Sequence, residues 1–68
     1  MDFTIQYFGP FDQMLYVESV DVEELDNALE RARAVIKQPQ DPQPIGYVIL
    51  DGRGRQVARG YKRDVQPQ

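Results

Sequence analysis

A chain of 68 residues and 7.9 kDa has room for one domain with a single small core. It contains no cysteine and no histidine, which excludes disulfides, thiolate chemistry, and the commonest general base and metal ligand. With 41% hydrophobic and 28% charged residues, the composition is that of an ordinary globular domain.

Charge is distributed unevenly along the chain. Residues 1–36 hold eight acidic side chains and two arginines, whereas residues 37–68 hold six basic and three acidic side chains. This polarity fits two solvated faces on a small domain. It also fits steering toward a partner, or pairing of opposite poles between two copies.

Nothing in the sequence indicates a membrane protein. The longest unbroken apolar run, Tyr47–Leu50, is far shorter than the roughly 18 residues that a spanning helix needs. The chain starts without a basic region followed by an apolar stretch. We therefore expect a cytoplasmic protein.

The first 20 residues predict a β-hairpin. Residues 3–7 alternate apolar and polar side chains with a period of two, which indicates a half-buried strand. Residues 9–13 (GPFDQ) have the composition of a turn. Residues 14–20 are rich in β-branched and aromatic side chains, with Leu15 and Val17 on one face and Tyr16 and Glu18 on the other.

A helix is predicted over residues 22–37, where apolar side chains recur every three or four residues. Asp21 and Glu24 have the spacing of a capping box at its start, with Val20 and Leu25 placed for a hydrophobic staple. Pro39 ends it. The proline-rich residues 39–44 favour an extended polyproline strap, which we interpret as a connector rather than a docking peptide.

The rest of the chain predicts a second hairpin, with strands over 45–50 and 55–62 around the turn Asp51–Gly54. Residues 64–68 are expected to form a flexible tail. The fold class is therefore α+β: one domain over residues 1–63 in ββαββ order. The simplest architecture is a mostly antiparallel four-stranded sheet with the helix packed on one face.

This layout leaves one face of the sheet without a helix. The chain nevertheless carries more apolar and aromatic side chains than one helix can cover. A plain hairpin with Gly52–Gly54 as its loop places Ile49 opposite Val57, Tyr47 opposite Arg59 and Ile45 opposite Tyr61. Ala58 and Gly60 then face the helix, together with Val48 and Leu50. An exposed apolar patch that carries tyrosine and arginine is typical of an interface. The residues expected to bind a partner are Tyr47, Ile49, Arg53, Arg55, Val57, Arg59 and Tyr61.

These features favour a non-enzymatic protein-interaction module that binds a protein partner or a second copy as a homodimer. We expect no catalytic residues, cofactor, metal, membrane or small-molecule substrate. In size, acidity and lack of catalytic residues the chain is similar to phage-encoded inhibitors such as anti-CRISPR proteins, which act by occupying a host surface. The alternative is a single-stranded nucleic-acid binder that uses the Arg/Tyr hairpin. The pI near 4.7 weighs against it.

Overall fold

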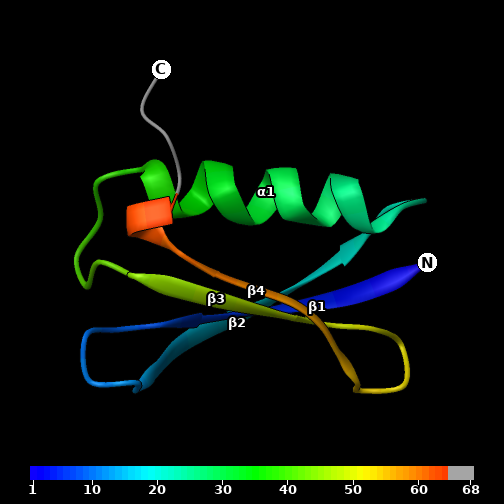
Figure 1. Cartoon of the computed structure of the whole chain (residues 1–68), viewed down its shortest axis with the longest axis horizontal. Coiled ribbons are helices and arrows are strands. Elements are labelled where there is room, and N and C mark those ends of the chain that lie inside the picture. The colour runs from blue at the N-terminus through cyan, green and yellow to red at the C-terminus, as the bar shows by residue number, and fades with distance from the viewer. Residues whose placement is uncertain (65–68) are drawn as a thin grey trace.

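The computed structural model describes residues 1–64 and confirms the predicted ββαββ fold (Figure 1). Four antiparallel strands form one sheet in the order β2-β1-β3-β4, and one helix packs on it. The elements are β1 (Asp2–Phe8), β2 (Met14–Asp21), α1 (Leu25–Lys37), β3 (Gly46–Leu50), β4 (Gln56–Tyr61) and the 3-10 helix η1 (Lys62–Asp64). Asp64, expected to begin the tail, therefore belongs to η1, and residues 65–68 lie outside the described residues.

The core lies between α1 and the two central strands. Alternate residues of β1 and β3 face the helix, because Ile5 pairs with Ile49 and Tyr7 with Tyr47 across the ladder. β4 presents Ala58 and Gly60 on the same side. The buried residues that form this cluster are Phe3, Ile5, Tyr7, Ala28, Ala32, Val35, Ile36, Tyr47 and Ile49.

The helix starts three residues later than predicted, and the capping-box prediction is wrong. Asp21 pairs with Asp2 in the sheet, and the Val22 N–H donates to the Met1 carbonyl at 3.0 Å. The backbone around residues 21 and 22 is thus used by the ladder and cannot begin a helix. Glu24 is the N-cap residue and makes no side-chain capping bond. The Asp21 carboxylate instead lies 3.4 Å from the N-terminal ammonium.

The connector from α1 to β3 is held by two glutamines. Gln40 donates through Nε2 to the Val35 carbonyl at 2.8 Å, and Gln43 donates to the Ile36 carbonyl at 3.2 Å. Gln43 also accepts the Gln40 backbone N–H at 3.1 Å. These bonds satisfy carbonyls in the last turn of the helix, which have no partner within it. The segment therefore connects the helix to the sheet.

The register predicted for the second hairpin is wrong by one residue. Val57 is an extra residue in β4, because Leu50 pairs with Gln56 while Ile49 pairs with Ala58. A bulge of this kind shifts every later pair by one position. Tyr47 consequently pairs with Gly60 rather than with Arg59. The prediction that Ala58 and Gly60 face the helix is confirmed, but their neighbours on that face are Tyr47 and Ile49.

Candidate functional site

The sheet face opposite α1, here called the open face, carries apolar side chains that no helix within residues 1–64 covers. It is formed by the alternate residues of each strand that point away from the core, so Val17, Gln6, Val48 and Arg59 lie in one row across the sheet. Val17 is 51% exposed and Val57 39% exposed. The other apolar side chains that point to this face include Phe8, Leu50 and Tyr61, which are half-buried, and Val48, which is 8% exposed.

The two hairpin turns border this face. In Figure 1 the turn between β1 and β2 and the turn between β3 and β4 both lie on the side of the sheet away from α1, at opposite ends of the strands. The twist of the sheet carries the two turns to that side. The open face therefore lies between two loops that project past it.

A small cavity indents the open face near the first turn. Its volume is about 160 Å³. The Tyr61 ring lies over Gly46, where a side chain would stand about 3.2 Å from the ring. The charged groups at the cavity are Asp12 and Arg59. The lining residues are Phe8, Asp12, Gly46, Tyr47, Val48, Arg59, Gly60 and Tyr61.

Arginines gather around Tyr61 at the β4 edge. The guanidinium groups of Arg59 and Arg63 lie 5.8 and 5.3 Å from the centre of the Tyr61 ring, which is within the range of cation–π attraction. Arginine side chains therefore already cover part of the tyrosine. This corner of the open face combines positive charge with aromatic surface.

Asp51 organises the second turn. Its Oδ1 accepts the backbone N–H groups of Arg53 and Arg55, both at 2.9 Å, and its Oδ2 lies 3.2 Å from Arg55 Nε. Hydrogen bonds from the Arg55 backbone, and then from the Arg53 backbone and the Arg55 side chain, lower the pKa of Asp51. The Arg55 side chain is therefore paired with Asp51 in the same turn, whereas the Arg53 side chain is exposed.

The structure brings some of the predicted binding residues together and separates others. Val57, Arg59 and Tyr61 lie on the open face as predicted, and Arg53 and Arg55 lie in the turn next to it. The prediction that Tyr47 and Ile49 face outward is wrong. Tyr47 is 4% exposed, and both side chains belong to the core beneath α1. The cause is the bulge at Val57, which no residue type in the hairpin indicated.

Several open-face residues were missed by sequence reasoning. Phe8 and Val17 were not assigned to the open face, and the prediction that Val48 and Leu50 face the helix is wrong. Phe11 was interpreted only as part of a turn, although it is 88% exposed. The alternation of β2 contained the signal for Val17. Using it requires knowing that Tyr16 and Glu18 turn toward the helix, and a charged residue beneath a helix is not the first expectation.

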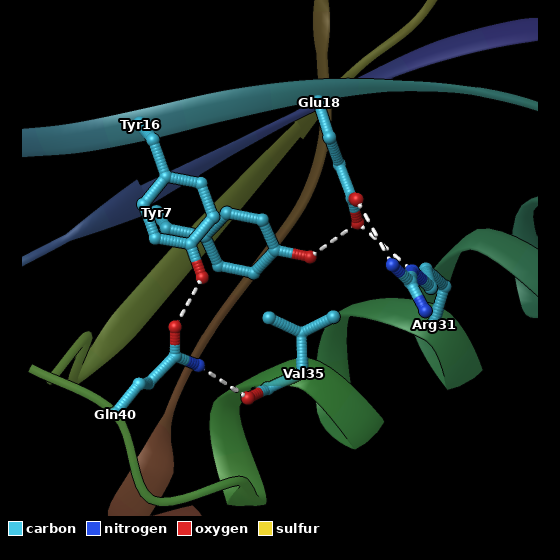
Figure 2. A network of polar contacts seen from close by, with 6 residues as sticks. All are labelled: Tyr7, Tyr16, Glu18, Arg31, Val35 and Gln40. Carbon is cyan, nitrogen blue, oxygen red and sulfur yellow. Dashed lines mark hydrogen bonds and ion pairs between the residues drawn. The ribbon is translucent and has the colours of Figure 1, made fainter.

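Glu18 tolerates this position because a network of polar contacts joins the sheet to the helix (Figure 2). The Tyr7 hydroxyl donates to Glu18 Oε1 at 2.7 Å. Arg31, from α1, donates through Nε to Oε1 at 3.1 Å and through its NH2 group to Oε2 at 3.2 Å. The carboxylate thus satisfies a buried phenol on one side and is neutralised by an arginine on the other.

A second branch of the network starts at Tyr16. Its ring packs 4.8 Å from that of Tyr7, centre to centre, and its hydroxyl donates to Gln40 Oε1 at 2.8 Å. Gln40 in turn holds the Val35 carbonyl (Figure 2). The two tyrosines therefore link β1 and β2 to the middle and the end of the helix. This arrangement fixes the helix on the sheet.

The network shifts the pKa values of its members. Burial, followed by the hydrogen bond to Glu18, raises the pKa of Tyr7 well above its usual range. Burial alone would raise the pKa of Glu18, but hydrogen bonds from Arg31 and Tyr7 and the charge of Arg31 together lower it. The Glu18 carboxylate raises the pKa of Arg31. All three shifts favour a charged Glu18–Arg31 pair next to a neutral Tyr7 hydroxyl.

The raised pKa of Tyr7 predicts a loss of stability in alkali. Below the pKa of tyrosine in the unfolded chain, about 10, the contribution of Tyr7 to stability is fully present. Above it only the unfolded chain ionises, and the contribution falls by about 1.4 kcal/mol per pH unit. We expect the melting temperature of the wild type to fall more steeply between pH 9.5 and 11.5 than that of Tyr7→Phe. Parallel curves for the two proteins would contradict this interpretation.

Residues 1–64 contain neither a metal-binding cluster nor a membrane-spanning helix. No group of three or more acidic side chains in this part of the chain is arranged to hold a metal ion. The single α-helix among the described residues is too short and too polar to cross a membrane. Comparison of the chain with known protein families, curated proteins and solved structures gave no match. The candidate site therefore rests on the geometry of the open face.

Proposed function

We propose that this chain is a non-enzymatic protein-interaction module that binds its partner through the open face and acts by occupying a surface of that partner. The observation that carries the proposal is the exposure of Val17 and Val57 at opposite edges of a sheet face that none of the helices in the described part of the chain covers. Apolar side chains gathered on one face of a small domain are typical of an interaction site.

The make-up of the open face supports the same proposal. Burial of apolar surface contributes about 25 cal/mol per Å² removed from water, so the exposed Val17 and Val57 would contribute more to binding than Val48, which is already buried in the free chain. Tyr61 and Arg59 add the residue types that are enriched at binding hot spots. Arg53 and Arg59 place positive charge at one edge, which would orient an acidic partner.

The test replaces the two exposed valines with aspartate. We expect Val17→Asp/Val57→Asp to reduce the capture of a protein partner from native lysate at least tenfold, because both changes place charge in the proposed interface. The melting temperature should change by only a few degrees, since both side chains are already exposed. The matched control is Ala34→Asp on the exposed side of α1.

The experiment distinguishes a protein partner at the open face from a partner elsewhere and from nucleic acid. Loss of a captured protein with the valine variant, but not with the Ala34 control, supports the proposal. Equal capture by the wild type and both variants contradicts it. Capture that disappears after nuclease treatment would replace it with the nucleic-acid alternative.

One observation favours that alternative, single-stranded nucleic-acid binding: the guanidinium groups of Arg59 and Arg63 both lie over the Tyr61 ring. Aromatic rings stack on bases and guanidinium groups contact phosphates. A base would, however, have to displace a guanidinium group from the ring, so we favour the protein partner. Titration of a fluorescent oligonucleotide decides the question. Binding that weakens steeply with salt supports the alternative, and no binding at 50 mM salt removes it.

A further inference from the structure

The first turn presents a phenylalanine to solvent on a well-ordered loop. Phe11 is 88% exposed, yet the backbone around it is held by three hydrogen bonds. The Gly9 N–H donates to the Gln13 carbonyl at 2.9 Å, the Asp12 N–H to the Gly9 carbonyl at 3.1 Å, and the Phe11 N–H to Gln13 Oε1 at 2.8 Å.

The Gln13 side chain further closes this loop. It lies over Gly9 so closely that a Cβ there would stand 2.7 Å from it. The loop is therefore ordered before any partner binds, and little conformational entropy would be lost when Phe11 becomes buried. An exposed aromatic side chain on a preorganised loop has the properties of an interface anchor.

The cavity on the open face has the size of such an anchor. Its volume of about 160 Å³ is close to that of a cavity known to hold a benzene molecule, about 150 Å³. Val48, Phe8 and the Tyr61 ring give it apolar walls, and Arg59 stands at its edge. Asp12, the residue next to Phe11, also lines it. The anchor and the cavity are therefore neighbours on one molecule.

We propose that the occupant of this cavity is Phe11 of a second copy of the chain, inserted reciprocally in a two-fold dimer. The proposal rests on the proposed function, since it names the partner of the open face. When an anchor and its receptor cavity lie side by side, a two-fold axis between them fills both cavities at once. A single self-complementary patch is then sufficient for the whole interface.

Charge complementarity supports a second copy as the partner. Insertion of Phe11 carries the Asp12 carboxylate of one copy toward Arg59 at the edge of the other cavity. On a larger scale, Asp12 lies next to β2 at one edge of the sheet and Arg59 lies in β4 at the other, whereas Asp21 and Arg55 are already paired with the N-terminal ammonium and Asp51. A two-fold axis parallel to the strands places the acidic edge of each copy over the basic edge of its partner.

The first test is sedimentation equilibrium of the full chain. We expect the wild type to dimerise with a dissociation constant in the micromolar range, and Phe11→Ser to weaken dimerisation at least about 100-fold, since two anchors are lost per dimer. Ala34→Ser, on the exposed side of α1, should dimerise like the wild type. A monomeric wild type at several hundred micromolar, or dimerisation unaffected by Phe11→Ser, would overturn the proposal.

A mixing experiment tests the reciprocal geometry. Phe11→Ser keeps an open cavity but has no anchor, and Val48→Phe keeps the anchor but fills the cavity. We expect neither variant to dimerise alone and an equimolar mixture to form heterodimers that are weaker than the wild-type dimer. Absence of heterodimers, with both variants folded by circular dichroism, contradicts reciprocal insertion. Arg59→Glu leaves the cavity open but places a carboxylate where Asp12 of the other copy would lie, so it too should dimerise more weakly than the wild type.

These results are distinguishable from failure of the proposed function. If the wild type is monomeric and captures another protein that Val17→Asp/Val57→Asp fails to capture, only the dimer is overturned. If neither self-association nor capture depends on the open face, both proposals fail.

Discussion

Replacing Gly60 with alanine should destabilise the domain by about 2 kcal/mol. A Cβ at this position would stand 2.5 Å from the Tyr47 hydroxyl oxygen and 2.6 Å from its Cζ, separations that require one group to move. Tyr47 is 4% exposed beneath α1, so its ring can move only toward the small cavity that it lines together with Gly60. Overpacking of this kind costs about 1–3 kcal/mol, and occasionally more.

Thermal unfolding measures this effect. For a domain of this size, about 2 kcal/mol corresponds to a fall in melting temperature of roughly 8–16 °C. Gly52→Ala is the matched control, because its Cβ would meet only the Asp2 carbonyl oxygen at 3.7 Å, and we expect a change within about 0.5 kcal/mol. Combining Gly60→Ala with Tyr47→Phe, which removes the nearest atom, should restore part of the loss. Equal melting temperatures for the two alanine variants would show that Tyr47 does not pack on Gly60.

Replacing Glu18 with alanine should cost about 2–3 kcal/mol at neutral pH. The substitution leaves the buried Tyr7 hydroxyl without its acceptor and removes the partner of Arg31. An unsatisfied buried polar group costs about 1–3 kcal/mol, and that term dominates, because an ion pair with a half-exposed arginine contributes little. Glu30→Ala, on the exposed side of the helix, should change stability by less than about 0.5 kcal/mol.

A double-mutant cycle isolates the contribution of the Tyr7 hydroxyl. Tyr7→Phe/Glu18→Ala removes both partners of the hydrogen bond, so it should cost less than the sum of the two single changes. Denaturant unfolding of the four proteins supplies the comparison. Strict additivity would contradict the network in Figure 2.

The loss of stability caused by Glu18→Ala should depend on pH. The pKa of Glu18 is lower in the folded protein than its usual value of 4.5. The contribution of the Glu18 carboxylate to the free energy of unfolding is therefore fully present above the pKa that it has in the unfolded chain. It is lost as the pH falls through the lower folded pKa. The difference in unfolding free energy between the wild type and Glu18→Ala should therefore shrink below pH 4.5. A difference that stays constant down to pH 2.5 would exclude the charged carboxylate as its source.

The fold was predictable because each element is specified locally. The apolar stripe of α1, the period-two alternation of β1 and the turn residues of both hairpins determine the element order. The start of the helix was not predictable from its cap residues. The ladder takes up the backbone near Asp21 through contacts with Met1 and Asp2, which are distant in sequence.

The candidate site was only partly predictable, for a similar reason. Arg59, Tyr61 and Val57 follow from strand alternation, but the bulge at Val57 sends Tyr47 and Ile49 to the opposite face. A slip of one residue reverses every side chain on a strand. Phe11 was overlooked because turn composition explains a loop without showing which of its side chains is exposed. Such features depend on tertiary packing.

The most direct test of the open face as the binding surface is methyl relaxation by an inert paramagnetic cosolute. In dilute free protein, the methyl groups of Val17, Val57 and Ala34 should all be relaxed by the cosolute, because all three side chains are exposed. At high protein concentration, or with a captured protein added, we expect the two valines to become protected while Ala34 stays accessible. Protection of Ala34 with both valines still accessible would assign binding to the helix and contradict the account.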